Sequence, residues 1–189
     1  VPRDRPPPAC RGLATGRGSR VNVVAPATGI EPDSAGKPAP TMFLLAADRA
    51  GAHAPLVVGD RLNSDHAGAR AAGFPGLLVF TGVSSPRDAI LAAPDERPSY
   101  LAADLTELLE AHPAPASTVD GWWTCRAGAA RVVGGRLETR GSHAPVPERV
   151  DLVRAACAAA SAVVDSGAEL EPGSIPALTV GEGEGAGPS

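Results

Sequence analysis

The feature that most constrains the fold is a series of short apolar runs that alternate with helical patterns between residues 38 and 112. Two of these runs, PLVVG and GLLVF, are continuous and rich in branched aliphatic side chains, which is typical of strands buried on both faces of a parallel sheet. A shorter run, SYLAA, follows them. The alternation predicts an α/β fold in which short helical connections join parallel strands.

Helices are predicted between these strands. The segment TMFLLAADRAGA places three apolar side chains, Met42, Leu45 and Ala46, on one face before a glycine ends the helix. SDHAGARAAG is expected to begin with Ser64 or Asp65 as its cap. SPRDAILAA and DLTELLEAH supply the helices that precede and follow SYLAA.

The pattern changes beyond about residue 117. ARVV and RLET, separated by two glycines, predict a β-hairpin, and Trp122 and Trp123 are expected to anchor it on the core. A long helix follows, PERVDLVRAACAAASAVVDSG. Its apolar stripe is formed by Val150, Val153, Cys157, Ala160 and Val164. We interpret this region as a small α+β extension.

Four regions are therefore expected. Residues 1–20 lack apolar periodicity and are predicted to be disordered. Residues 21–116 form the α/β unit, and residues 117–178 form the extension. Residues 179–189 read as a disordered, low-complexity tail.

Composition excludes several classes of function. With 17 basic and 21 acidic residues, the net charge of −4 does not favour a nucleic-acid partner. No apolar run is long enough for a membrane helix, and the three cysteines lack the spacing of a disulfide framework or zinc site. Nor do the four histidines, His53, His66, His112 and His143, have metal-site spacing. The cytoplasm is the simplest compartment.

Two carboxylates follow the first buried strand, in the segment LVVGDRLNSD. Ligands of open parallel sheets bind at the carboxyl ends of strands, so Asp60 is placed at a binding crevice, with Asp65 just beyond the loop. Mg²⁺ takes one or two such oxygens together with water and a substrate phosphate. The competing interpretation is structural: Asp60 only ends a strand, and Asp65 only caps a helix.

Lys37 is the only lysine among 16 arginines, and it lies in a glycine-proline turn that opens the helix leading to this strand. A compact ammonium group near two carboxylates and a phosphoryl group neutralises developing charge. The competing interpretation is that Lys37 has no functional role and was retained by chance in an ordinary turn.

The stretch GKPAPTMFLLAADRAGAHAPLVVGDRLNSDHAGARAAGFPGLLVFTGVSS closely resembles the end of the catalytic core of haloacid dehalogenase (HAD)-like phosphatases. The subclass contains NagD-type nucleotide phosphatases, p-nitrophenylphosphatases, phosphoglycolate phosphatases and bacterial glycerol 3-phosphate phosphatases. The resemblance covers about residues 36–109, and residues 121–167 look like the extra C-terminal region of some bacterial members. It implies a partial Rossmann-like, HAD-type parallel sheet with flanking helices, and makes residues 21–116 the C-terminal half of that core.

The resemblance also implies residue roles. GKP matches the family's third motif, so Lys37 would be the charge-stabilising lysine. GDRLNSD matches the fourth motif, whose acidic residues fall on Asp60 and Asp65 and help to hold Mg²⁺. Within this motif, Ser64 replaces the usual threonine and His66 replaces an aliphatic residue. The latter is expected to loosen packing at the helix start.

Three parts of the family's machinery have no match here. The D-x-D-G-T segment with the nucleophile, the Ser/Thr of the second motif and the cap domain are not found before Lys37. The resemblance thus implies a Mg²⁺-dependent phosphomonoester hydrolase acting on a small phosphorylated metabolite, such as glycerol 3-phosphate or phosphoglycolate, in a truncated chain. The alternative is an inactive α/β remnant that binds Mg²⁺ or phosphate, or serves as an interaction module. A dinucleotide-binding fold, prompted by TGRGSR, is disfavoured because no strand precedes that segment.

Overall fold

The computed structural model describes residues 8–9, 12–13, 35–141 and 146–180. The expected disorder of residues 1–20 and 179–189 therefore concerns, for the most part, residues outside these ranges. The elements at the N-terminal end are β1 (Pro8–Ala9) and β2 (Gly12–Leu13), which pair in antiparallel fashion.

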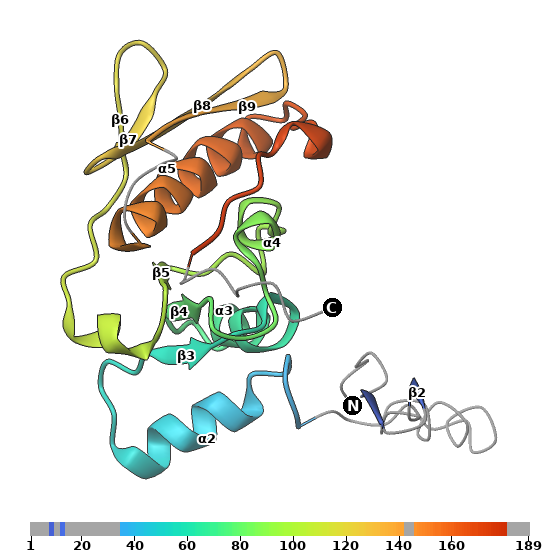
Figure 1. The fold of residues 1–189 in the computed structure, drawn as a ribbon. Helices are drawn as coiled ribbons and strands as arrows, with labels where there is room; N and C mark the ends of the chain where they lie inside the picture. The colour runs from blue at the N-terminus through green and yellow to red at the C-terminus, as the bar shows by residue number, and fades with distance from the viewer. Residues whose placement is uncertain (1–7, 10–11, 14–34, 142–145, 181–189) are drawn as a thin grey trace, which may run out of the picture.

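A three-stranded parallel sheet forms the centre of the α/β unit (Figure 1). Its strands, β3 (Val57–Gly59), β4 (Gly76–Val79) and β5 (Tyr100–Ala102), lie side by side in chain order. All four residues of β4 are buried, as expected for a central strand covered on both faces. The predicted α/β class is confirmed.

β3 is less buried than its sequence predicts. Val57 is buried, but Leu56 and Val58 are 39% and 37% exposed. The prediction of a strand covered on both faces is wrong for β3. The reason is its position, because within the described residues β3 pairs only with β4 and forms the edge of the sheet.

The helix α2 (Thr41–Ala50) ends as predicted at Gly51, whose φ of 58° is in the left-handed region. None of its residues is buried, however, and Met42 and Leu45 are 43% and 52% exposed. The inward contact comes instead from the ring of Phe43, which approaches Gly68 so closely that a Cβ there would clash with it. The face predicted from Met42 and Leu45 is therefore not the packed one.

The connection between β3 and β4 also differs from expectation. It begins with a π-helical turn, η1 (Leu62–His66), and continues as the helix α3 (Ala67–Ala71). Helical structure thus starts before Ser64 and Asp65, and neither side chain caps it. The predicted cap is wrong because the carboxylate of Asp65 accepts hydrogen bonds from Lys37 and from the backbone N–H of Arg61 instead.

The two remaining connections follow their sequence signals more closely. The helix α4 (Pro86–Ile90) is capped by a reciprocal capping box between Ser85 and Asp88. The segment after β5 starts with Asp104 as its cap, as DLTELLEAH suggests, but forms a 3₁₀ helix, η2 (Leu105–Leu109), rather than an α-helix.

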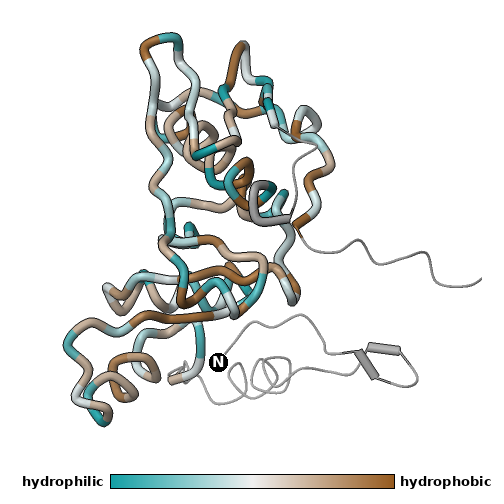
Figure 2. Tube along the Cα trace, turned by 60° about the vertical axis from the view of Figure 1, so that its left-hand side comes forward, coloured by the Kyte–Doolittle hydropathy of each residue, from teal (hydrophilic) through white to brown (hydrophobic). Residues whose placement is uncertain are grey.

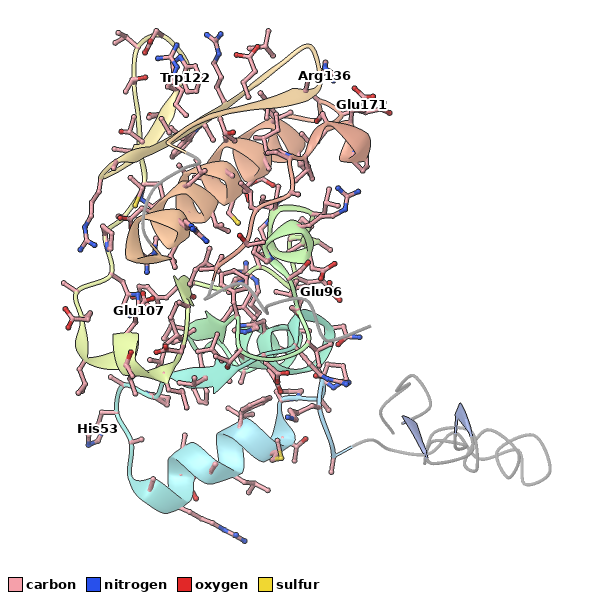
Figure 3. All side chains as sticks on the ribbon, in the orientation of Figure 1. His53, Glu96, Glu107, Trp122, Arg136 and Glu171 are labelled. Atoms are coloured by element: carbon pink, nitrogen blue, oxygen red, sulfur yellow. The ribbon has the colours of Figure 1, made fainter. Side chains whose placement is uncertain are left out.

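The C-terminal region consists of an antiparallel sheet packed along one long helix (Figure 1). The strands are β6 (Ala116–Ser117), β7 (Trp123–Cys125), β8 (Gly128–Val133) and β9 (Arg136–Arg140). The predicted hairpin is confirmed, with Gly134 and Gly135 both at positive φ. Arg136 pairs with Glu171, just before η3 (Pro172–Ser174), at 2.8 Å (Figure 3).

The long helix α5 (Val146–Asp165) packs against both sheets. Ala155, Ala156 and Ala159 pack against residues of the antiparallel sheet such as Ala130 and Leu137. At its N-terminal half, Val150 and Val153 join a cluster with Leu78 and Leu101 of the parallel sheet. Figure 2 shows apolar residues along the strands of the parallel sheet. A boundary between units near residue 116 stays a prediction.

None of the helices in the described part of the chain has the length and apolar character needed to cross a bilayer.

Candidate functional site

The candidate site lies at the carboxyl end of β3. Asp60 directly follows the strand, and Asp65 lies in the η1 turn five residues later. Lys37 approaches from the turn that precedes α2. The three residues predicted from the sequence therefore converge on one edge of the parallel sheet, where ligands of such sheets bind.

Lys37 and Asp65 are in direct contact. Nζ of Lys37 donates to Oδ1 of Asp65 at 2.6 Å, and the backbone N–H of Arg61 donates to the other carboxylate oxygen at 3.1 Å. The Asp65 side chain is only 8% exposed, whereas that of Lys37 is 42% exposed. The carboxylate is thus held inside the turn, while the lysine side chain that binds it remains partly exposed.

A glycine before Asp60 makes room for this arrangement. A Cβ at Gly59 would lie 2.5 Å from Cβ of Asp65, closer than real side chains approach. The glycine of the GD pair is therefore required by the packing of Asp65 against the end of β3.

Asp60 is positioned by the loop after β4. Its Oδ2 accepts a hydrogen bond from the N–H of Val83 at 2.9 Å, and its backbone carbonyl accepts one from the N–H of Ser84 at 3.0 Å. The Oγ of Ser84 in turn accepts a hydrogen bond from Leu62 N at 3.2 Å. Gly82 packs directly against the carboxylate of Asp60, with no space for a Cβ.

The loop residues Gly82, Val83 and Ser84 were not among the predicted site residues. The signal was present in TGVSS, which follows GLLVF. The carboxyl ends of adjacent parallel strands meet at the same edge of a sheet, so the loop after β4 must lie beside Asp60.

His66 is buried beneath the site. It is 1% exposed, its Nε2 lies 3.3 Å from the carbonyl oxygen of Gly59, and burial lowers the pKa of the imidazole. Its Nδ1 is buried against Gly76 and has no hydrogen-bond partner in the described part of the chain. The structure thus packs His66 as a neutral core residue.

The metal-binding potential of the site rests on two carboxylates. Within the described ranges 35–141 and 146–180, no group of three or more histidine, cysteine, aspartate or glutamate side chains could hold a metal ion. Mg²⁺ needs no such cage, because water and substrate oxygens complete its octahedral shell. Two carboxylates at a strand end therefore fit Mg²⁺ better than a metal that needs several protein ligands.

Residues 34–108 match a family model described as HAD-hydrolase-like. The chain is 46% identical over 119 residues to D-glycerol 3-phosphate phosphatase of Mycobacterium tuberculosis strain H37Rv, a match that covers 60% of this chain and 34% of that protein.

Solved structures show the same relationship. Glycerol phosphate phosphatase from Mycobacterium tuberculosis, in complex with magnesium, matches with a TM-score of 0.69 and 39% identity over 84% of this chain and 46% of that one. The p-nitrophenyl phosphatase from Archaeoglobus fulgidus matches with a TM-score of 0.50 and 32% identity over 57% of this chain and 43% of that one. The chain thus spans between about a third and a half of the length of these relatives.

Proposed function

We propose that the chain, which is similar to the C-terminal part of HAD-like phosphatases, belongs to a Mg²⁺-dependent phosphomonoester hydrolase. The substrate class is a small phosphorylated metabolite such as glycerol 3-phosphate or phosphoglycolate. The observation that carries the proposal is the 2.6 Å contact between Lys37 and Asp65 at the end of β3, beside Asp60. We assign the protein to the cytoplasm.

In this proposal Asp60 and Asp65 hold Mg²⁺. Asp60 is the direct ligand, because the Val83 N–H engages only its Oδ2 and the structure records no hydrogen bond to Oδ1 from the described residues. Asp65, which already binds Lys37 and the Arg61 N–H, acts through water. Bound Mg²⁺ would supply positive charge to the phosphoryl oxygens.

Lys37 supplies the second positive charge. Asp65 fixes its ammonium group, and the lysine side chain is 42% exposed, so a phosphate can approach it from solvent. A charge held in place in this way stabilises developing negative charge without reorganisation during the reaction. The loop of Gly82 and Val83 keeps Asp60 oriented toward the same edge.

The covalent step needs a group that this sequence does not contain. Transfer of a phosphoryl group to a carboxylate requires a nucleophile in line with the leaving oxygen, and no D-x-D-G-T segment occurs in the 189 residues. The proposal therefore includes that these residues form part of a longer phosphatase, and that alone they bind Mg²⁺ without hydrolysing phosphate esters.

The first test is direct binding to the present chain. Isothermal titration with MgCl₂ is expected to show saturable binding that Asp60→Asn weakens about tenfold or more, a loss typical of removing a charged ligand group. Asp95→Asn, which removes an exposed carboxylate from a different loop, should leave binding unchanged. Equal binding by all three proteins would remove Asp60 from the site.

The second test uses a longer gene product. Translation of the upstream DNA in three frames should reveal D-x-D-G-T before an apolar strand. In that protein, Lys37→Ala and Asp60→Asn are each expected to lower kcat for glycerol 3-phosphate by about 100-fold or more. Wild-type rates in both variants would refute the assigned roles.

The missing nucleophile favours one alternative function, a noncatalytic module that binds Mg²⁺ or phosphate. This alternative predicts metal or phosphate binding by the chain with no D-x-D-G-T segment in any upstream frame. The two tests together therefore distinguish it from the phosphatase.

A further inference from the structure

A second cavity lies away from the candidate site, where the parallel-sheet unit meets α5. It has a volume of about 260 Å³ and is formed by four segments: Ala89 of α4, residues 97–101 leading into β5, residues 112–115 of the following connection, and one side of α5. None of Lys37, Asp60 and Asp65 lines it. A ligand bound there would touch both units of the molecule.

The polar groups that line this junction cavity are hydrogen-bond donors. They are Arg97, Ser99, Tyr100, His112, Arg154 and Ser161. No aspartate or glutamate lines the cavity. The carboxylates that neutralise the two arginines, Asp151, Glu107 and Asp165, all lie outside the lining.

Arg154 is held rigidly at the base of the cavity. It is only 7% exposed, with Nη1 2.5 Å from Asp151 and Nη2 2.5 Å from the carbonyl oxygen of Leu101. Glu107, which belongs to η2 and is labelled in Figure 3, accepts a further hydrogen bond from Nη2 at 3.2 Å. The guanidinium group is therefore fixed before any ligand arrives.

Arg97 is oriented in a similar way at the side of the cavity. Its Nη1 donates to both oxygens of Asp165, at 2.8 and 2.9 Å, and its side chain is 17% exposed. Two preorganised arginine side chains thus line one small volume, Arg97 from the segment before β5 and Arg154 from α5.

The neighbouring groups add directional donors. Nδ1 of His112 lies 3.4 Å from Nη2 of Arg154. The Ser99 hydroxyl oxygen accepts from the N–H of Gly76 at 3.3 Å, so its own proton remains available to a ligand. The His112 ring lies 5.5 Å from that of Tyr100.

We propose that the junction cavity binds a small organic carboxylate whose apolar body lies against the prolines, Leu101 and Ala158 of the lining. A carboxylate supplies only acceptors, which matches a lining that holds hydroxyl and guanidinium donors and no acid, while Asp151, Glu107 and Asp165 balance the charge of the two arginines from outside it. Pro98, Pro113 and Pro115 provide rigid apolar walls for the remainder of the ligand. This inference does not depend on the phosphatase proposal.

The test compares benzoate with benzamide, which has nearly the same shape but no charge. Isothermal titration of the full chain should show saturable one-to-one binding of benzoate and at least about tenfold weaker binding of benzamide, as expected for loss of a charge-assisted contact. Absent benzoate binding, or equal binding of the two compounds, would overturn the proposal.

Two variants locate the binding site. Arg97→Gln should weaken benzoate binding about tenfold or more, whereas Arg131→Gln, which also removes an arginine from a carboxylate ion pair but outside the cavity, should not. Ser161→Phe fills the cavity from α5 and should abolish binding, with an unchanged circular dichroism spectrum as the check on folding. Wild-type affinity in Arg97→Gln or in folded Ser161→Phe would refute the location.

Discussion

Lys37 and Asp65 are 28 positions apart in the sequence, yet Nζ of one lies 2.6 Å from Oδ1 of the other. The contact forms because α2 and β3 run back and forth between them, and because Gly59 allows Asp65 to pack against the strand end. It ties the turn before α2 to the η1 turn and gives the edge of the sheet a defined arrangement of charge.

Replacement of Asp65 by asparagine should destabilise the fold moderately. The carboxylate is 8% exposed and accepts hydrogen bonds from an ammonium and a backbone N–H, so we expect a loss of about 1–3 kcal/mol in the free energy of unfolding. Arg136→Gln breaks a pair whose partners are 65% and 55% exposed and should cost less than about 1 kcal/mol. Urea denaturation checks both, and equal effects would contradict the structural role of Asp65.

Addition of a methyl group at Gly82 should displace Asp60. The new Cβ would clash with the carboxylate, so Gly82→Ala should weaken Mg²⁺ binding by the chain as strongly as Asp60→Asn does. Gly173→Ala is the matched control, because nothing lies within 4 Å of a Cβ at that position. Titration calorimetry measures both. Unchanged affinity in Gly82→Ala would show that the loop does not position Asp60.

The sequence predicted turns and helix ends well, because each of these depends on a few neighbouring residues. The hairpin at Gly134 and Gly135, the end of α2 at Gly51 and the capped start of α4 each depend on a few neighbouring residues. The parallel order of β3, β4 and β5 followed from short helical connections, which leave few other topologies.

Properties that depend on distant neighbours were not predicted. Val58 and Leu45 are exposed because β3 is an edge strand and no residue of α2 is buried. The sequence of one segment does not indicate which other segments pack against it. The sequence offers Asp65 both as a helix cap and as a carboxylate of the Mg²⁺ site, and its ion pair with Lys37 shows why the cap does not form. The convergence of Lys37 with the two aspartates was predicted through family resemblance and strand-end geometry, but the supporting loop at Gly82 was not.

The buried charges of α5 were likewise overlooked. Asp151 and Arg154 are 1% and 7% exposed within a helix predicted only by its apolar stripe. Their spacing, one turn apart, was a visible sign of an ion pair, but nothing in it indicated burial.

Breaking this buried pair should be costly. Arg154→Met leaves Asp151 buried with only the Nη1 of Arg126, 3.7 Å away, as a cationic partner, so we expect a loss of about 3–5 kcal/mol in the free energy of unfolding. The double variant Asp151→Leu/Arg154→Met removes both charges and should recover much of that loss. A double-mutant cycle measured by urea denaturation checks this. Additive losses in the double variant would contradict a coupled pair.

The two thiols of the described residues should make stability fall at high pH. Burial raises the pKa of Cys125 from 9.0 to about 11 and that of Cys157 to about 12. Between pH 9 and those values the unfolded chain loses protons that the folded chain retains, so the free energy of unfolding should decrease as the pH rises.

We expect the urea midpoint to drop between about pH 8 and about pH 10.5 more in a Cys10→Ser protein than in one that also carries Cys125→Ala and Cys157→Ala. Cys10 lies outside the described residues, so its removal confines the comparison to Cys125 and Cys157. Identical pH profiles would show that both thiols titrate normally in the folded state.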